Sequence, residues 1–332
     1  MFQKRFIAPV IWGLCLALVI LVSDGFTADK TWTVARESKI QSDLLDIYFL
    51  DHDYGWIVGT KGTILHTSDG GQNWVPQKTS ISKDLSNICF IDREQGWIAG
   101  GDGLISHSSD GGQTWLRQPS GTEAALQTIF FIDAKIGWAG GDGGLIIHTT
   151  DGGINWVKQS SGTNNEIQDI QFVNPSKGCA VGGGTTILSS EDGGETWVER
   201  IVELGTTLTG VCLVNNEGWA VGANGALAHT ADGITWEVQE SRVPNTNGMP
   251  EPIWGVHFIN NQRGLAVAEF GVILKTEDGG GGAGGGEAEA EDSGGWQPLS
   301  PRPTGNRLQD VQFVSETEAW AVGRYGTIIH ST

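Results

Sequence analysis

The sequence predicts an all-β fold, a seven-bladed β-propeller built from four-stranded antiparallel blades. A phrase of about 40 residues recurs along the chain; its first half opens on a pair such as Gly55-Trp56. Its second half is a loop of the form Asp-Gly-Gly-x-Asn/Thr-Trp, as from Asp69 to Trp74. One such repeat cannot bury its own apolar face, so the repeats must pack against one another in a single domain.

Seven repeats are marked by one equivalent anchor position. The anchors are Trp56, Trp97, Trp138, Cys179, Trp219, Leu265 and Trp320. Their spacings are 41, 41, 41, 40, 46 and 55 residues, so the fifth and sixth repeats carry insertions.

Each repeat predicts four strands in a fixed order. The first shows the period-two alternation of a strand, and we expect first strands at 45–49, 86–90, 127–131, 168–172, 209–213, 254–258 and 309–313. A Gly-Trp-x-Val-Gly strand and an Ile-Ile-His-Thr strand follow, and the fourth begins at the second tryptophan. Four antiparallel strands per repeat are typical of a propeller blade.

The loop before the fourth strand carries an aspartate at an equivalent place in six repeats. These residues are Asp69, Asp110, Asp151, Asp192, Asp232 and Asp278. A carboxylate there can accept backbone N–H groups across its own turn, while the glycines take positive φ. We therefore interpret this loop as structural.

The count of strands predicts how the ring closes. Six second tryptophans lie inside the repeats, the seventh repeat ends before its own, and Trp32 stands unused near the N-terminus. The last blade is therefore expected to combine three strands from 307–332 with an outermost strand at 31–36. Trp32 is expected to pack into that blade.

Composition changes mark the remaining segments. Residues 1–28 combine Lys4 and Arg5 with a long apolar run, which indicates either a cleaved signal peptide or a membrane anchor. Residues 29–332 form the expected propeller domain. Within it, the Gly/Glu-rich insertion 279–295 is expected to be disordered. The leader predicts an exported protein, either periplasmic, extracellular or lumenal.

Charge and cysteine usage exclude several classes. The formal charge is −19 and no basic stripe is present, which argues against nucleic-acid binding. Cys89, Cys179 and Cys212 show no metal-type or disulfide spacing, so we interpret them as small buried residues. No metal, cofactor or small-molecule substrate is expected, and the protein is expected to be a monomer.

The Asp-Gly-Gly-x-Thr-Trp loop is the Asp-box, or bacterial neuraminidase repeat, of several propeller families. Together with the Gly-Trp-Ala-Val-Gly and Ile-Ile-His-Thr strands, it makes residues 29–332 resemble the photosystem II stability/assembly factor family. That resemblance implies an exported seven-bladed propeller without enzymatic activity, lumenal in photosynthetic cells, that binds reaction-centre subunits during their assembly. The implied partner is therefore a membrane-protein subunit.

Two groups of residues are candidates for a binding site. Asp46, Asp169 and Asp310 share one position of the first strand and would form a partial acidic ring at one mouth of the channel, suited either to an ion or to hydrogen bonds between strands. The second group gathers arginine and aromatic side chains in loops of one face near the C-terminus, where a protein contact is expected. It comprises Arg242, Phe270, Arg302, Arg307, Arg324 and Tyr325.

Two other patterns carry structural interpretations. Five third strands carry a histidine at one repeat position, which Ser189 and Lys275 take in the other two repeats, so these histidines are expected to lie too far apart to share a metal. They are His66, His107, His148, His229 and His330. A sialidase-type hydrolase, the alternative enzymatic function, needs a tyrosine nucleophile such as Tyr48 beside Asp46 and an arginine triad. Only Tyr48, Tyr54 and Tyr325 are available, and Tyr48 is better interpreted as a packed strand residue. We therefore expect no catalytic residues, and a structural envelope propeller with another client is the remaining alternative.

Overall fold

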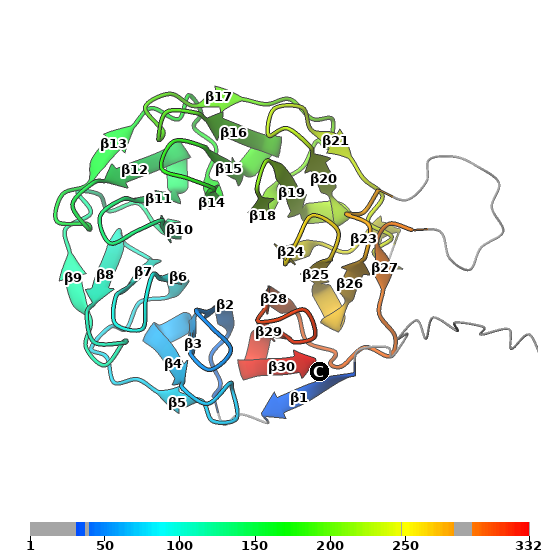
Figure 1. The fold of residues 1–332 in the computed structure, drawn as a ribbon, viewed down its shortest axis with the longest axis horizontal. Coiled ribbons are helices and arrows are strands. Elements are labelled where there is room, and N and C mark those ends of the chain that lie inside the picture. The colour runs from blue at the N-terminus through cyan, green and yellow to red at the C-terminus, as the bar shows by residue number, and fades with distance from the viewer. Residues whose placement is uncertain (1–30, 37–39, 247, 282–293, 332) are drawn as a thin grey trace, which may run out of the picture. The chain divides into compact units, whose positions relative to one another are not determined.

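The computed structural model describes residues 31–36, 40–246, 248–281 and 294–331. The expected leader, residues 1–28, lies outside the described residues, as does most of the insertion 279–295. Within the unit Thr31–Thr332, seven four-stranded antiparallel sheets stand as blades around a central axis (Figure 1). The prediction of a seven-bladed all-β propeller is confirmed. Among the described residues, no helix is long and apolar enough to cross a membrane.

Blades 1 to 6 run from the innermost to the outermost strand in chain order, whereas the outermost strand of blade 7 is β1. Blade 1 holds β2 (Leu44–Phe49), β3 (Gly55–Gly59), β4 (Thr63–Thr67) and β5 (Val75–Pro76). Blade 2 holds β6 (Leu85–Phe90), β7 (Gly96–Gly100), β8 (Leu104–Ser108) and β9 (Leu116–Gln118). Blade 3 holds β10 (Leu126–Phe131), β11 (Gly137–Gly141), β12 (Leu145–Thr149) and β13 (Val157–Gln159). Blade 4 holds β14 (Ile167–Phe172), β15 (Gly178–Gly182), β16 (Thr186–Ser190) and β17 (Val198–Glu199).

The later blades follow the same order with additions. Blade 5 holds β18 (Leu208–Val214), β19 (Glu217–Gly222), β20 (Leu227–Thr230) and β21 (Glu237–Val238). A hairpin of β22 (Asn245–Thr246) and β23 (Met249–Pro250) occupies the connection to blade 6. Blade 6 holds β24 (Ile253–Phe258), β25 (Gly264–Ala268), β26 (Ile273–Thr276) and β27 (Gln297–Pro298). Blade 7 holds β28 (Leu308–Phe313), β29 (Ala319–Gly323), β30 (Thr327–Ser331) and β1 (Trp32–Arg36).

Strand β1 closes the ring. It pairs antiparallel with β30, with Trp32 opposite Ser331 and Val34 opposite Ile329 (Figure 1). The predicted composite blade is therefore confirmed. Trp32 packs against a cluster that includes Leu265 and Phe313, but its side chain is only half-buried, because β1 is the outermost strand. The expectation that Trp32 packs into the last blade thus holds in part.

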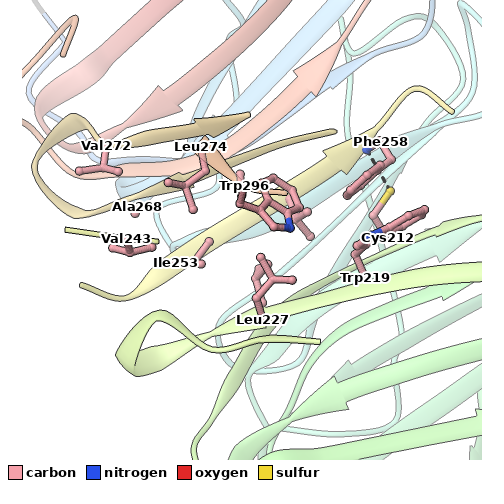
Figure 2. Packing of buried hydrophobic residues seen from close by; sticks show 13 residues of the cluster. Cys212, Trp219, Leu227, Val243, Ile253, Phe258, Ala268, Val272, Leu274 and Trp296 are labelled. Atoms are coloured by element: carbon pink, nitrogen blue, oxygen red, sulfur yellow. Dashed lines mark hydrogen bonds between the residues drawn. The ribbon is translucent and has the colours of Figure 1, made fainter. Parts of the chain in front are cut away.

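The core is divided among the interfaces between neighbouring blades. In the described chain there are seven buried apolar clusters, one per interface. Figure 2 shows the cluster between blades 5 and 6, where Trp296, Leu227 and Ile253 meet. There the backbone N–H of Phe258 donates to the Cys212 sulfur at 3.3 Å. The three described cysteines are buried free thiols, as predicted.

The anchor tryptophan fastens one blade to the next. Trp56 of blade 1 stacks on Phe90 of blade 2 with ring centroids 3.6 Å apart, and its Nε1–H donates to the Gly111 carbonyl at 3.0 Å. Blades 2, 3 and 5 repeat this geometry through Trp97, Trp138 and Trp219. Aromatic stacking joined to a buried hydrogen bond fixes the angle between blades.

Three interfaces are built differently. Between blades 6 and 7, Leu265 takes the tryptophan position and packs with Phe313. Between blades 4 and 5, Cys179 and Leu213 occupy the tryptophan and phenylalanine positions. Between blades 7 and 1, Trp320 lies 5.7 Å from Phe49 by ring centroid, which is wider than the usual stack. The closing interface therefore depends more strongly on its other contacts.

Candidate functional site

The turns between second and third strands and the connections into the next first strand lie on one face, here called the turn face. In blade 1, η1 (Thr60–Gly62) forms such a turn, and the Thr60 N–H donates to the carbonyl of Asp43, just before β2. The Lys61 N–H donates to Asp84, just before the first strand of blade 2. Equivalent turns are η2 (Asp142–Gly144), η3 (Gly183–Thr185), η4 (Ala223–Gly225), η5 (Glu269–Gly271) and η6 (Arg324–Gly326).

Two aromatic residues stand out from the turn face on adjacent blades. Phe270 is the middle residue of η5 and is 46% exposed, whereas Tyr325 is the middle residue of η6 and is 68% exposed. Both backbones are left-handed, with φ of 53° and 57°. Each turn therefore presents an aromatic ring to solvent from a conformation that bulky residues rarely adopt.

Arg307 and Arg302 surround the Phe270 turn. The Arg307 guanidinium pairs with Glu269, which precedes Phe270, through Nη2 and Oε1 at 2.7 Å. The same guanidinium lies over the Trp254 ring, with Cζ 4.1 Å from the ring centroid. Arg302 Nη1 donates to the Phe270 carbonyl at 3.5 Å. The structure thus brings Phe270, Arg302 and Arg307 together with Trp254 and Glu269, two residues that sequence reasoning missed.

The other members of this group lie on either side. Arg324 approaches Asp43 of blade 1 at 3.9 Å, and the Tyr325 N–H donates to the same carboxylate at 3.0 Å. Arg242 lies half-buried in the connection from blade 5 to blade 6, with φ of 51°. That connection also carries the hairpin β22–β23, whose Met249 is 65% exposed. The hairpin could not be predicted from the repeat, because it belongs to an insertion.

The first strands surround a cavity of about 220 Å³ at the mouth of the channel. Every blade contributes to its wall, and Asp46, Asp169 and Asp310 all lie in it. The remaining lining residues are Leu45, Ser86, Asn87, Gln127, Gln168, Thr209, Gly210, Trp254, Gly255, Val256 and Gln309. The wall is rich in uncharged hydrogen-bonding groups and contains one aromatic ring.

Side chains at one position of the first strand connect neighbouring blades. Asp310 accepts from the Ile47 N–H at 3.1 Å, and Asp46 accepts from the Ile88 N–H at 2.7 Å. Farther round the ring the acceptors are Asn87 for Ile129, Thr128 for Ile170 and Asp169 for Val211. Gly210 and Gly255 hold this position in blades 5 and 6, where the Thr209 hydroxyl instead donates to the Ile253 carbonyl at 2.8 Å. The acidic ring thus contributes directly to the joining of the blades.

Asp46 and Asp310 form a carboxyl pair at the closing interface. Burial raises the pKa of Asp46 well above its ordinary value, and the hydrogen-bonded carboxyl of Asp310 raises it further. Burial also raises the pKa of Asp169, to about 6. Within the described part of the chain, no group of three or more histidine, cysteine and acidic side chains could hold a metal ion.

The six Asp-box aspartates occupy the loops between third and fourth strands. In blade 1, Asp69 accepts from the Asn73 N–H and the Thr67 hydroxyl, both at 2.8 Å. Hydrogen bonds from Asn73 and Thr67 lower its pKa. Equivalent acceptors are Asp110, Asp151, Asp192, Asp232 and Asp278.

In blade 6 the Asp-box keeps its hydrogen bonds although it contains an insertion. Asp278 accepts from the Gly295 N–H at 2.8 Å, although the two residues lie 17 positions apart. The Trp219 Nε1–H of blade 5 donates to the Gly279 carbonyl at 2.9 Å, and the equivalent tryptophans of other blades donate to the equivalent glycine carbonyls. Gly279, Gly280 and Gly295 therefore belong to the box, and the inserted residues lie between Gly280 and Gly295.

The tyrosines lie in blades 1 and 7, and the third-strand histidines lie on separate blades. The Tyr48 hydroxyl donates to the Phe90 carbonyl at 2.6 Å, and burial raises its pKa. Tyr54 lies under the Arg93 guanidinium in blade 1, whereas Tyr325 is on the turn face of blade 7. His66 stacks on Trp56 of its own blade, and burial lowers its pKa. The side chains of Tyr48, Tyr54 and His66 are thus engaged within a blade or between neighbouring blades.

Comparison with known proteins gives one family. The family model described as "Photosynthesis system II assembly factor YCF48" matches residues 26–123, 80–164 and 156–295. Over 49 residues the chain is 47% identical to the photosystem II stability/assembly factor HCF136, chloroplastic, of Guillardia theta, covering 14% of this chain and 12% of that protein. Over 75 residues it is 35% identical to the photosystem II assembly lipoprotein Ycf48 of Trichormus variabilis, covering 22% of this chain and 21% of that protein.

A solved structure described as "YCF48 bound to D1 peptide" shares the fold. Its TM-score is 0.72 at 19% identity, over 92% of this chain and 95% of that one. At 19% sequence identity, the similarity between the two structures shows a shared fold alone. The stretches shared with the curated relatives are short, whereas the family model spans most of the propeller.

Proposed function

Because the chain belongs to the photosynthesis system II assembly factor family, we propose that it is an exported, non-enzymatic propeller that binds a segment of a reaction-centre subunit during assembly. The relative that was solved with a D1 peptide supports a client of that kind. The name of the Trichormus relative, a lipoprotein, supports a membrane-associated, lumenal location in which residues 1–28 act as leader or anchor and 29–332 as the binding domain.

The observation that carries the proposal is the unequal turn face. Blades 5 to 7 present exposed apolar side chains, Met249, Phe270 and Tyr325, beside the arginines. The middle residues of the equivalent turns in blades 1 to 4 are Lys61, Asp102, Gly143 and Gly184. Arginine and aromatic residues are enriched at protein interfaces, and the chain as a whole carries a charge of −19. A cationic, apolar arc on an acidic protein fits an acidic client segment.

The arginines differ in what they can contribute. Arg307 is paired with Glu269 and covers Trp254, so its reversal would disturb the turn itself. Arg302 is exposed, and within the described residues it has no carboxylate partner. Arg324 is 41% exposed and lies 3.9 Å from Asp43. Arg302 and Arg324 are therefore the residues whose charge is available to a client.

Charge reversal tests the proposal. A double Arg302→Glu, Arg324→Glu variant should bind D1-derived peptides at least tenfold more weakly, whereas its Tm should stay within about 2 °C, because exposed substitutions seldom change stability by more than ~0.5 kcal/mol. Binding is measured by fluorescence anisotropy on overlapping synthetic peptides that span the D1 subunit.

The matched control is a double Arg117→Glu, Lys158→Glu variant, which makes the same change in net charge on exposed outer strands of blades 2 and 3. It should bind like the parent. Equal weakening by both pairs would reduce the effect to net charge and contradict a site on blades 6 and 7. Failure of the parent to bind any of the peptides would favour the remaining alternative, a structural propeller with another client.

A further inference from the structure

The seven turns of the turn face impose the same backbone on their middle residue. All seven middle residues have a left-handed φ, between 53° and 69°. They are Lys61, Asp102, Gly143, Gly184, Asn224, Phe270 and Tyr325. The turn thus fixes the backbone conformation of its middle residue, and the seven turns differ only in the side chain that this residue carries.

Glycine, asparagine and aspartate tolerate this conformation, whereas a bulky side chain is strained in it. Asn224 of blade 5 shows that asparagine fits the turn in this protein. Phe270 and Tyr325 hold bulky rings there on two consecutive blades, and burial does not offset the strain, since the rings are 46% and 68% exposed. Strained residues persist at binding sites when the strained conformation presents a needed group.

The surroundings indicate what these rings meet. The Phe270 carbonyl receives Arg302, and Glu269 before it orients Arg307 over Trp254 at the rim of the cavity. On blade 7, Arg324 immediately precedes Tyr325. On blade 5, Pro250 of β23 packs against Gly225 of η4 and leaves Met249 exposed. On the turn face, the connection from blade 5 to blade 6 and the turns of blades 6 and 7 therefore each offer an exposed apolar side chain, and the two aromatic ones stand beside arginine.

We propose that Phe270 and Tyr325 are anchor residues for the client, an extended segment that carries apolar side chains beside carboxylates. The apolar side chains pack on the two rings, and the carboxylates face Arg302 and Arg324. This inference rests on the proposed function and deepens it, since it assigns specificity to the rings as well as attraction to the arginines. Rigid aromatic side chains suit this role because little rotamer freedom is lost on binding.

Because the left-handed turns are strained, removal of the two rings is expected to keep or raise the melting temperature while it lowers the affinity for the peptide. A double Phe270→Asn, Tyr325→Asn variant places at both turns the residue found at Asn224. Its Tm should be equal to or a few degrees above that of the parent, because asparagine relieves the left-handed strain. Its affinity for the D1-derived peptide bound by the parent should fall at least tenfold, as lost interface anchors typically produce. Both quantities are measured on the same preparations.

The matched control is Lys61→Asn, which makes the same backbone change in the equivalent turn of blade 1. It should leave peptide affinity unchanged. If the aromatic double variant melts several degrees lower, the rings serve the fold and the proposal is wrong. If the aromatic double variant binds the peptide as tightly as the parent while the arginine double variant does not, Phe270 and Tyr325 are not anchor residues. The proposed client site on the turn face is then still supported. A parent chain that binds no D1-derived peptide contradicts the proposed function, and this inference with it.

Discussion

At the scale of single residues, the same position in the repeat serves different electrostatic roles. Asp46 and Asp169 are equivalent residues of their first strands, and both line the channel cavity. Asp169 accepts N–H groups at both oxygens, from Ile170 at Oδ1 and from Val211 at Oδ2. Asp46 accepts from Asn87 and Ile88 through one oxygen, and its carboxyl also shares a hydrogen bond with Asp310. The surroundings of Asp46 therefore favour its protonated form, whereas Asp169 uses both oxygens as acceptors.

This difference predicts opposite results for the same substitution. The raised pKa of Asp46 means that the unfolded chain releases its proton from about pH 4 upward while the folded chain retains it, so stability from this group is lost as pH rises. Asp46→Asn mimics the protonated acid and should gain stability relative to the parent as the pH rises above about 4, the ordinary pKa of an aspartate. Each pKa unit corresponds to about 1.4 kcal/mol, so urea unfolding at several pH values can resolve the divergence.

Asp169→Asn is the matched comparison. Its amide nitrogen would have to face a backbone N–H that now reaches a carboxylate oxygen, so this variant should be destabilised by roughly 1–3 kcal/mol at about pH 4. The difference from the parent should narrow between about pH 4 and pH 6, because the pKa of Asp169 is itself raised to about 6, and should stay constant above about pH 6. A constant stability difference between Asp46→Asn and the parent across the pH range would show that no proton is held at the closing interface.

At the scale of elements, the closing interface depends on strand β1. β30 lies between β29 and β1, so removal of β1 would expose a full edge of unpaired backbone groups. This interface also has the wider stack of Trp320 on Phe49. The first and last segments of the chain therefore jointly stabilise the ring.

A chain beginning at Ile40 should melt clearly below one beginning at Asp29, by at least about 5 °C, as expected for the loss of a paired strand from a domain of this size. Trp32→Ala alone should cost about 2 kcal/mol, less than the ~3–5 kcal/mol of a fully packed aromatic, because the ring is half-buried. Calorimetry of the three chains checks both values. Equal melting of the shortened and longer chains would contradict closure by β1.

Element positions were accessible from the sequence because the repeat imposes them. Period-two alternation places the first strands, and the unmatched Trp32 indicates the composite blade. The contacts between blades were not accessible. Asp46 bonds to Ile88, 42 positions away, and Arg307 pairs with Glu269, 38 positions away. Such pairs depend on the rotation between blades, which no local pattern encodes.

At the scale of the whole molecule, the regular blades provide the scaffold and the departures from regularity provide the candidate site. The hairpin β22–β23, the aromatic turns η5 and η6, and the arginine-bearing connection from blade 6 to blade 7 all lie on the turn face of blades 5 to 7. Sequence reasoning found the arginines and rings of this arc by composition. It missed the strain at Phe270, because the left-handed φ of this residue is a property of the folded backbone.

The most direct test of a client site on this arc is amide hydrogen exchange of the full chain with and without a bound D1-derived peptide. Bound peptide shields backbone groups beneath it, so we expect slower exchange in residues 248–254, 269–271, 300–307 and 324–326, with unchanged exchange in the equivalent turns of blades 1 to 4. Slower exchange confined to the Asp-box loops or to the outer strands of blades 1 to 4 would place the client elsewhere and contradict the account.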